Sequence, residues 1–513
     1  MRGLLEVYSK GRYQAAWIED DVTHFGLGKH GDVVNARILF NNGLTQNIFQ
    51  PPTQSLVEEV QAPKGSCPFV YGFDGQRWQF ITDLCWNAPL GLQIARGKSL
   101  PDRAWEYLLL PGRLVQPIDG VYGLRVTEEL WEAAYMDTVQ MVALDHPADV
   151  EVFTNEKVGP AGIAEPRVWA FRDLRPIHRV VDGHGKDWTQ WLQHQDGRYA
   201  VPFQRRICQG LVEPTRLDLE LAQPLLPSRQ VQLILHGWIF PTDTSLNIAI
   251  DQNPTLDPPQ PPALWARDGK GNWKEVLPFM GFPGGKPKSI VIDLTGKLPF
   301  EVTALRIEGS QEIYWDRMAL AVDQSLDPND SNVLVRQPLE LLSGELRFRG
   351  VSRMVMGSRE QPHGFDYQET MTVPAWPPMQ DGFTRYGDVT KWIKDRDGDL
   401  VVMGSGDEID LRFQAPLQSL REGWQRDFQM HNVGWDKDAD LSTLEGQSTM
   451  PLPFEGMESY PPSAGQWRRA EEVIRRHRDL LTRRQSTSAF WTQSSQTAPK
   501  GGSPNGTSTH DAN

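Results

Sequence analysis

The sequence predicts an all-β protein built from several domains. At 513 residues the chain is long for one hydrophobic core, so we expect two to four domains. Its 45 glycines and 39 prolines punctuate many short segments in which apolar and polar residues alternate, the pattern of half-buried strands. A motif that occurs twice, D-x-T-x-W-[L/I]-x-x-x-D-G, indicates that two of the domains are related.

The two copies of the motif are followed by the same features in the same order. Each copy precedes an alternating strand and then a Gly-Trp pair: 187–197, 217–221 and Gly237-Trp238 in the first, and 388–398, 409–413 and Gly434-Trp435 in the second. This shared order predicts two related, jelly-roll-like β-sandwiches, at residues 151–330 and 331–460. We expect each motif to form a short helix with its tryptophan, Trp191 or Trp392, buried.

The regions outside these sandwiches have their own patterns. Residues 1–60 read as short strands with a hairpin turn at Asn42-Gly43, because both residues tolerate the positive φ of such a turn. Residues 61–150 read as a β-hairpin region. Residues 461–485 predict a short basic helix, and the Ser-, Thr-, Gly- and Asn-rich residues 486–513 predict a disordered tail.

The N-terminal motifs resemble a known module. Leu5-Glu-Val-Tyr8, Gly11-Arg-Tyr-Gln14, His24-Phe-Gly-Leu-Gly28 and Asn41-Asn-Gly43 are similar to the ASPIC/UnbV module, which closes FG-GAP propeller proteins related to cartilage acidic protein. Two departures stand out. The family's Arg-Trp-Pro-x-Gly is Leu39-Phe-Asn-Asn-Gly43 here, and the polar segment before the histidine is shortened to 19–23.

This resemblance carries further expectations. It implies that residues 1–60 are an incomplete ASPIC/UnbV module without its propeller. The chain from 61 to about 460 resembles an uncharacterised extension found in bacterial ASPIC/UnbV and tetratricopeptide-repeat proteins. The resemblance therefore implies an extracytoplasmic location and a partner region that is a separately encoded β-propeller or a tetratricopeptide repeat.

Charge and composition exclude some classes of partner. A net charge of -14 and a pI near 5.3 argue against a nucleic-acid binder, which would need a basic surface. The sequence has no apolar run long enough for a transmembrane helix, and residues 1–8 lack the apolar length of a signal peptide. Of the three cysteines, Cys67 and Cys85 flank an expected hairpin, so they form either a disulfide or two buried thiols.

Two aspartate-rich stretches are candidates for a calcium site. Asp395-Arg-Asp-Gly-Asp399 places carboxylates at alternate positions but lacks the glycine and glutamate spacing of an EF-hand loop. Asp436, Asp438 and Asp440 follow Trp435, and Asp440 follows it at the interval at which Asp243 follows Trp238. Ca²⁺ bound by these three aspartates is one interpretation, and a solvated polar loop is the other.

The polar-aromatic strand Tyr314, Trp315, Asp316 and Arg317 is the candidate ligand-binding face. Aromatic rings stack on sugars or peptide groups, and an Asp and Arg pair supplies directional hydrogen bonds. The alternative is that Trp315 lies in the core and that the charged pair is structural.

The sequence lacks the common catalytic motifs. It contains no Gly-x-Ser-x-Gly, no His-Glu-x-x-His and no phosphate-binding glycine loop. The function that we expect is therefore a non-catalytic binding or interaction module with a carbohydrate or protein ligand. The alternatives are a carbohydrate-active hydrolase with an Asp/Glu pair, and a structural scaffold for a separately encoded propeller.

Overall fold

The computed structural model describes residues 3–29, 31–40, 45–58, 67–100, 103–160, 162–355, 358, 360–371 and 376–485. The protein is all-β, as the sequence predicts, with its strands in several antiparallel sheets. Two compact units are present, and residues 1–62 belong to the first. The second consists of residues 63–374 and 379–485.

The first unit contains one antiparallel sheet with the strand order β2-β1-β3-β4. Its strands are β1 (Leu4–Ser9), β2 (Arg12–Trp17), β3 (Val33–Leu39) and β4 (Thr45–Phe49). Val7, Ala36 and Ile38 are buried in this unit. The expected turn at Asn42-Gly43 lies outside the described residues, between β3 and β4, whose ends pair at Leu39 and Thr45.

The larger sandwich of the second unit, here called the host sandwich, consists of two sheets. The first sheet has the order β31-β28-β33-β10-β5-β6, and the second has β27-β11-β34-β9 with β32 also paired to β11. The strands of the first sheet are β5 (Phe69–Phe73), β6 (Trp78–Asp83), β10 (Val121–Thr127), β28 (Leu341–Phe348), β31 (Gly387–Asp388) and β33 (Asp407–Gln414). Those of the second are β9 (Trp105–Leu110), β11 (Glu132–Pro147), β27 (Val335–Leu339), β32 (Val401–Gly404) and β34 (Trp424–Asp438). Side chains from both sheets form one apolar core between them.

The second sandwich is inserted into the first, between β11 and β27, and is here called the inserted sandwich. One of its sheets has the order β16-β18-β24-β20-β21 with β17 on β18, and the other has β15-β25-β19-β23. The strands of the first are β16 (Arg179–Asp182), β17 (Arg206–Cys208), β18 (Leu211–Leu225), β20 (Ala263–Arg267), β21 (Trp273–Leu277) and β24 (Val302–Gln311). Those of the second are β15 (Arg175–Pro176), β19 (Val231–Ile239), β23 (Lys288–Asp293) and β25 (Ile313–Val322). A separate apolar core fills the space between these two sheets.

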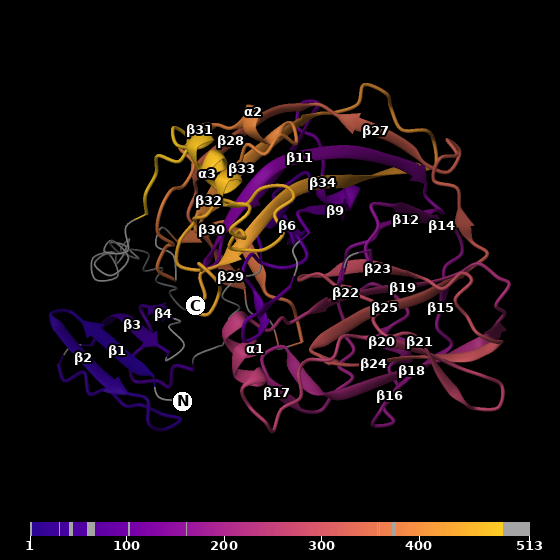
Figure 1. The fold of residues 1–513 in the computed structure, drawn as a ribbon, viewed down its shortest axis with the longest axis horizontal. Coiled ribbons are helices and arrows are strands. Elements are labelled where there is room, and N and C mark those ends of the chain that lie inside the picture. The colour runs from indigo at the N-terminus through magenta and orange to yellow at the C-terminus, as the bar shows by residue number, and fades with distance from the viewer. Residues whose placement is uncertain are drawn as a thin grey trace, which may run out of the picture. The chain divides into compact units, whose positions relative to one another are not determined.

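This insertion changes the domain organisation that the sequence suggested. The inserted sandwich lies within the expected range 151–330, but strands of 61–150 and 331–460 pair with one another. Strand β10 pairs with β33, and β11 pairs with β34 along its length, as Figure 1 shows for the two long neighbouring strands. The expected hairpin region and the expected second sandwich are therefore two halves of the host sandwich.

Short elements complete the second unit. They are β7 (Gln93–Ala95), β8 (Lys98–Ser99), β12 (Glu151–Thr154), β13 (Lys157–Val158), β14 (Val168–Phe171), β22 (Phe282–Pro283), β26 (Ser325–Leu326), β29 (Val351–Val355) and β30 (Gly364–Met371), with 3₁₀ turns Gly112–Leu114 and Thr189–Trp191. The α-helices in the described residues are α1 (Thr244–Asp251), α2 (Thr390–Ile393) and α3 (Trp467–Arg476). The expected basic helix is thus confirmed but ends at Arg476, and the expected tail, 486–513, lies outside the described residues.

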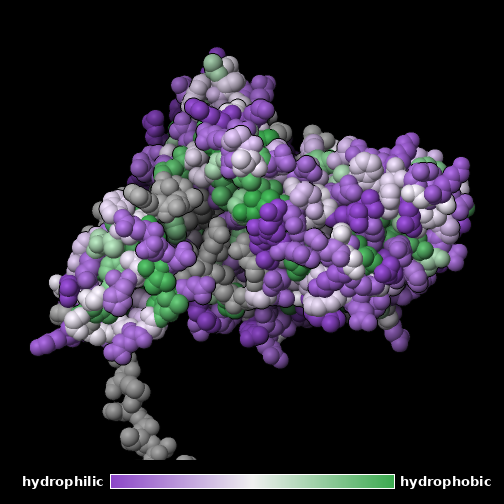
Figure 2. Space-filling view, turned by 90° about the horizontal axis from the view of Figure 1, so that it is seen from below, coloured by the Kyte–Doolittle hydropathy of each residue, from purple (hydrophilic) through white to green (hydrophobic). Residues whose placement is uncertain are grey.

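The face of the molecule that Figure 2 shows is mainly polar: hydrophilic side chains predominate on it, and hydrophobic ones form separate groups. No helix among the described residues is long and apolar enough to cross a membrane.

The repeated motif makes the same contacts in both sandwiches. Thr189 donates to Asp187 Oδ1 from its amide at 2.9 Å and from its hydroxyl at 2.6 Å. Thr390 makes the same two bonds to Asp388 Oδ1, at 2.9 Å and 2.5 Å. The two copies of the motif are therefore structurally equivalent at their start.

The ends of the motif are equivalent as well. In the first copy the amides of Asp196 and Gly197 donate to Asp316 Oδ1 at 3.1 Å and Oδ2 at 3.2 Å. In the second copy the amides of Asp397 and Gly398 donate to Asp137 Oδ1 at 3.3 Å and 2.9 Å. Both acceptors sit at a β-bulge, where the register of β25 on β19 and of β11 on β34 shifts.

The two tryptophans of the motif are not buried, so that expectation was wrong. Trp191 is 39% exposed and Trp392 is half-buried. The side chains that enter the cores are four residues apart in each copy: Trp188 and Leu192, on either side of the 3₁₀ turn, in the first, and Val389 and Ile393, at the two ends of α2, in the second. A single turn presents residues four apart to one face, and the motif tryptophan falls outside that face.

A cross-strand ion pair shows which strands correspond. Arg306 on β24 lies opposite Asp218 on β18 and binds it at 2.5 Å and 3.1 Å. Arg125 on β10 lies opposite Asp410 on β33, and its Nη1 donates to Asp410 Oδ1. Strands β10 and β11 of the host sandwich thus correspond to β24 and β25 of the inserted one, but they come first in the chain rather than last.

Candidate metal centre

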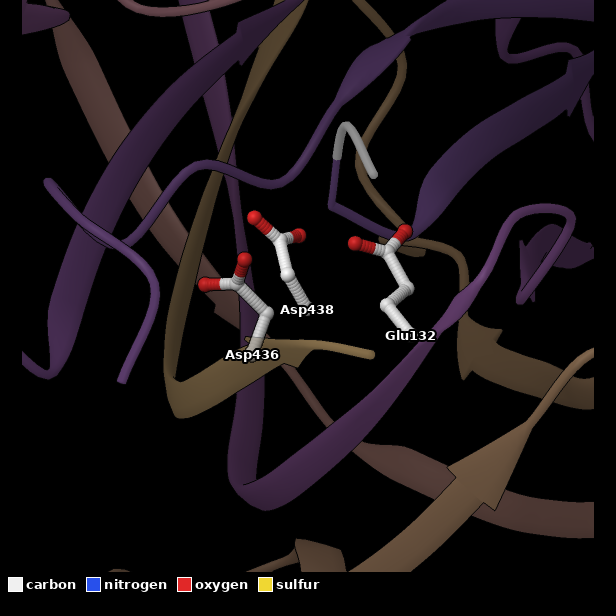
Figure 3. Close-up of side chains that lie close together, drawn as sticks. All are labelled: Glu132, Asp436 and Asp438. Carbon is white, nitrogen blue, oxygen red and sulfur yellow. The ribbon is translucent and has the colours of Figure 1, made fainter. Parts of the chain in front are cut away.

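Three buried carboxyl groups meet where β11 begins and β34 ends. Glu132 is paired with Asp438 across the two strands, and Asp436 lies two residues before Asp438. Because side chains of a strand alternate between its faces, all three lie on one face of the sheet. One oxygen from each lies within 4.8 Å of the others, and Figure 3 shows the carboxyl group of Asp438 between the other two.

Burial places these acids in an unfavourable environment. Asp436 is 1% exposed, Glu132 3% and Asp438 7%. Burial first, and the neighbouring acid Glu132 second, raise the pKa of Asp436 well above its usual range. Burial, followed by the charges of Glu128 and Asp438, raises the pKa of Glu132 in the same direction.

A fourth acid, Glu128, lies beside Glu132. It is fully buried, and burial raises its pKa to about 8. Its carboxyl group is hydrogen-bonded to that of Glu132, and its Oε1 accepts from the amide of Leu130 at 3.4 Å. No donor among the described residues reaches its Oε2.

Cys67 supplies hydrogen bonds to the centre. Its amide donates to Glu132 Oε2 at 3.1 Å, and its thiol donates to Asp436 Oδ2 at 3.5 Å. The other oxygen of Asp436, Oδ1, receives no hydrogen bond from the residues that the structure describes. A buried anionic oxygen without a donor is costly, so either a proton or a cation must neutralise it.

Two buried lysines that could have neutralised such charges are held elsewhere. Lys437 is adjacent to Asp436 in sequence, but its ammonium donates to the Met450 carbonyl at 3.2 Å and to the Tyr460 hydroxyl. Burial lowers its pKa to about 7. Lys288 binds Asp83 at 2.8 Å and Glu106 at 3.3 Å.

The centre includes two of the three aspartates that the sequence singled out for Ca²⁺. Asp440 is not in the three-carboxyl group: its Oδ1 accepts from Ser245 Oγ at 2.7 Å and from the Ser442 amide at 2.8 Å. Glu132 was not among the residues predicted from the sequence, because it lies about 300 residues before Asp436. Its one visible signal was the acidic run of Glu128, Glu129 and Glu132 between two expected strands.

The other acidic stretch and the polar-aromatic strand have different environments. Asp395 is exposed, and Asp399 pairs with Arg476 on the surface at 2.8 Å.

Tyr314, Trp315 and Asp316 are 0%, 2% and 1% exposed, so they do not form an accessible ligand-binding face. Strand β25 is central in its sheet, between β15 and β19, and both of its faces are covered.

Arg317, the fourth residue of that expected face, has a structural partner. Its guanidinium makes two bonds to Glu151, at 2.6 Å and 2.9 Å. The alternative, a core tryptophan with Asp316 and Arg317 as a structural pair, describes Trp315, but the two charged residues bind different partners: Asp316 the amides of Asp196 and Gly197, and Arg317 the carboxylate of Glu151.

The thiol of Cys67 also contacts Cys85. The two thiols are hydrogen-bonded to each other, and this contact, ahead of burial, raises the pKa of Cys67 well above its usual range. Both cysteines are free thiols in the structure. Cys67 is buried, whereas Cys85 is partly exposed.

Comparisons with known proteins add little to this geometry. No protein-family model matches the chain, and no curated protein matches it. Among solved structures, VP17, a capsid protein of bacteriophage P23-77, aligns with 64% of this chain and 96% of its own, at 12% identity and a TM-score of 0.07. A likeness at that TM-score carries no argument about fold or function.

Proposed function

We propose that this protein is a non-catalytic binding module whose host sandwich holds a divalent cation at Glu132, Asp436 and Asp438. The observation that carries the proposal is the buried Asp436 carboxyl group, one oxygen of which has no donor among the described residues. A dication at the centre would neutralise the three carboxylates at the point where β11 and β34 pair. Bound only by the folded state, it would also stabilise the sandwich by mass action.

Calcium is the cation that the ligand set favours. Carboxylate oxygens select hard cations over the softer metals that prefer sulfur or imidazole. Calcium binds oxygen at about 2.3–2.6 Å, so two of its ligands lie at most about 5 Å apart. The three oxygens lie within 4.8 Å of one another, a spacing that one calcium ion can span. Magnesium usually keeps several waters and is bound by only one or two carboxylates, whereas this centre offers three buried carboxyl groups.

The wider biological setting is proposed from the sequence motifs. The motifs at 5–28 support an ASPIC/UnbV-like module, and with it an extracytoplasmic bacterial protein whose partner is a β-propeller or a tetratricopeptide repeat. The four-stranded antiparallel sheet β2-β1-β3-β4 fits a small β-module of this kind. The ligand of the whole protein is proposed to be a carbohydrate or another protein.

The alternative function, a hydrolase with an Asp/Glu pair, would need a cavity lined by acids. One cavity of about 300 Å³ is lined by Glu151, Glu156 and Asp427 among other residues. Each of these carboxyl groups has structural partners: Arg317 for Glu151; the amides of Leu109 and Ser289 for Glu156; and the amide of Gly112 with the His146 ring for Asp427. These contacts favour a structural role for the three acids, so the proposal contains no catalytic step.

The test is a calcium titration of the full chain followed by calorimetry and by thermal unfolding. We expect saturable binding at neutral pH and a melting temperature that rises with calcium concentration. Asp436→Asn should abolish both effects, whereas Asp395→Asn, which removes an exposed carboxylate, should leave both unchanged.

A centre that is neutralised by shared protons would behave differently. In that case millimolar calcium would change nothing at pH 7, and Asp436→Asn would be neutral or stabilising because it removes a buried acid. That result would overturn the proposed function.

A further inference from the structure

The two thiols beside the metal centre face each other across adjacent strands. Strand β5 pairs with β6 so that Phe69 lies opposite Asp83. The Leu84 amide continues the ladder by donating to the Pro68 carbonyl at 2.7 Å. Cys67 and Cys85 come next on the two segments; the backbone of Cys67 leaves the extended conformation, with φ of 65°, and its thiol is hydrogen-bonded to that of Cys85.

This placement is close to what a disulfide needs. A disulfide needs Cβ atoms about 3.5–4.5 Å apart, and two thiols that are hydrogen-bonded to each other are within a short movement of that spacing. Cys67 precedes the first residue of β5 and Cys85 follows the last residue of β6, so both lie outside the paired strands, where a small shift breaks no bond between these strands. Closure therefore requires a local movement at the end of a hairpin.

The thiols differ in access, and one of them touches the centre. Cys85 is partly exposed, so a dissolved oxidant can reach it, while Cys67 is buried behind it. The Cys67 thiol donates to Asp436 Oδ2 at 3.5 Å, and its amide donates to Glu132 Oε2 at 3.1 Å. A chemical change at Cys67 therefore alters hydrogen bonding to two of the three carboxyl groups, those of Asp436 and Glu132.

We propose that Cys67 and Cys85 form a dithiol–disulfide site whose oxidation strengthens cation binding at Glu132, Asp436 and Asp438. The inference rests on the proposed function. In the reduced protein the Cys67 thiol hydrogen occupies Asp436 Oδ2. In the disulfide that hydrogen is gone, and the oxygen is available to the ion.

The oxidant is a low-molecular-weight disulfide such as oxidised glutathione. The Cys85 thiolate attacks one sulfur of the oxidant, forming a mixed disulfide and releasing one glutathione thiolate. The Cys67 thiol then loses its proton and attacks the Cys85 sulfur, which forms the protein disulfide and releases the second glutathione. The two electrons and both protons end on the two glutathione thiols.

The size of the effect follows from the hydrogen bond that is lost. A net contribution of about 0.5–1.5 kcal/mol for one hydrogen bond corresponds to about a 2- to 12-fold change in affinity. We therefore expect the oxidised protein to bind calcium about 2- to 12-fold more tightly than the reduced protein.

The experiment uses the full chain with Cys208→Ser, so that the third thiol does not react. The protein is incubated with oxidised or reduced glutathione without calcium, and peptide mass spectrometry then detects a Cys67–Cys85 linkage. Calorimetry measures calcium affinity for both forms. Cys85→Ser, which keeps the Cys67 thiol, is the matched control and should show one affinity under both conditions.

The outcomes separate this inference from the proposed function. A Cys67–Cys85 disulfide with tighter calcium binding supports the inference. A stable glutathione adduct on Cys85, no reaction, or a disulfide with unchanged or weaker affinity overturns it while leaving the cation site in place. Absence of calcium binding in both forms overturns the proposed function, and the coupling with it, even where the disulfide forms.

Discussion

Asp137 and Asp316 occupy equivalent bulges, yet replacing each with asparagine should have different effects. Asp316 accepts the two amides of its turn with two different oxygens, so Asp316→Asn puts an NH₂ group against one of the donors. Asp137 accepts both amides with Oδ1 alone, and no donor among the described residues reaches its Oδ2. Asp137→Asn can therefore keep both bonds.

The magnitudes follow from these contacts. Burial raises the pKa of Asp316 to about 6, as it does that of Asp137, so both asparagine variants escape a similar cost of a buried charge. They differ in the hydrogen bond that Asp316→Asn loses, which to a charged group is worth about 1.5–3 kcal/mol, so we expect Asp316→Asn to be less stable than Asp137→Asn by about that much at pH 7. Asp137→Asn should be neutral or stabilising at pH 8. Burial raises the pKa of Asp137 from 3.8 to about 6, and keeping it ionised in the fold therefore costs about 3 kcal/mol.

The pH dependence has a defined sign. The folded protein holds the Asp137 proton up to about pH 6, whereas the unfolded chain loses it near 3.8. This residue therefore contributes stability at low pH that is lost as the pH rises from about 4 to about 6. Asp137→Asn lacks this loss, so its stability relative to the wild type should increase between pH 4 and pH 8.

Urea denaturation at pH 4, 6 and 8 measures these differences, and hydrogen exchange at the Gly197 and Gly398 amides reports on the turns directly. The reasoning would be refuted if Asp316→Asn were no more destabilising than Asp137→Asn at pH 7. A stability difference between Asp137→Asn and the wild type that did not vary with pH would refute the electrostatic part alone.

Two further predictions concern packing. A Cβ atom at Gly237 would lie 2.4 Å from the Tyr314 carbonyl oxygen, and one at Gly434 would lie 2.5 Å from that of Tyr135. Alanine at either position should lower the free energy of unfolding, measured by urea denaturation, by at least about 1–3 kcal/mol. The control Gly465→Ala, whose added Cβ meets no atom within 4 Å, should leave it nearly unchanged. Trp188→Ala should lower the free energy of unfolding by about 3–5 kcal/mol because that ring is buried. Trp191→Ala should lower it clearly less because Trp191 is 39% exposed. Equal losses for the two variants would contradict the assignment of the buried face.

The fold class and the repeat could be read from the sequence because both depend on local patterns. Alternation within strands gives the all-β class, and the turn at Gly197 and Gly398 needs the positive φ that glycine tolerates, +77° and +74° here. The equivalence of the two motifs was visible for the same reason. The burial of Trp191 was misjudged because one helical turn has too few residues to define its apolar face by spacing.

Pairing between distant segments could not be read in this way. Nothing local to β10 indicates that its partner is β33, almost 300 residues later, so the host sandwich was divided into two expected domains. The same limit applies to the metal centre. Asp436 and Asp438 stood out by spacing, but Glu132 joins them through the register of β11 on β34.

The insertion between β11 and β27 has a consequence for how the chain folds. Asp145 and Val335 are paired across these two strands, so the chain leaves the host sandwich and returns to it at neighbouring points. An unfolded connection of roughly 190 residues would cost about 4–5 kcal/mol of closure entropy, whereas a connection of roughly ten residues would cost about 2 kcal/mol. An inserted sandwich that folds first acts as the shorter connection, holding β11 close to the strands that have yet to pair with it. Its folding would therefore accelerate assembly of the host sandwich, and the centre at Glu132, Asp436 and Asp438 would be among the last sites to form.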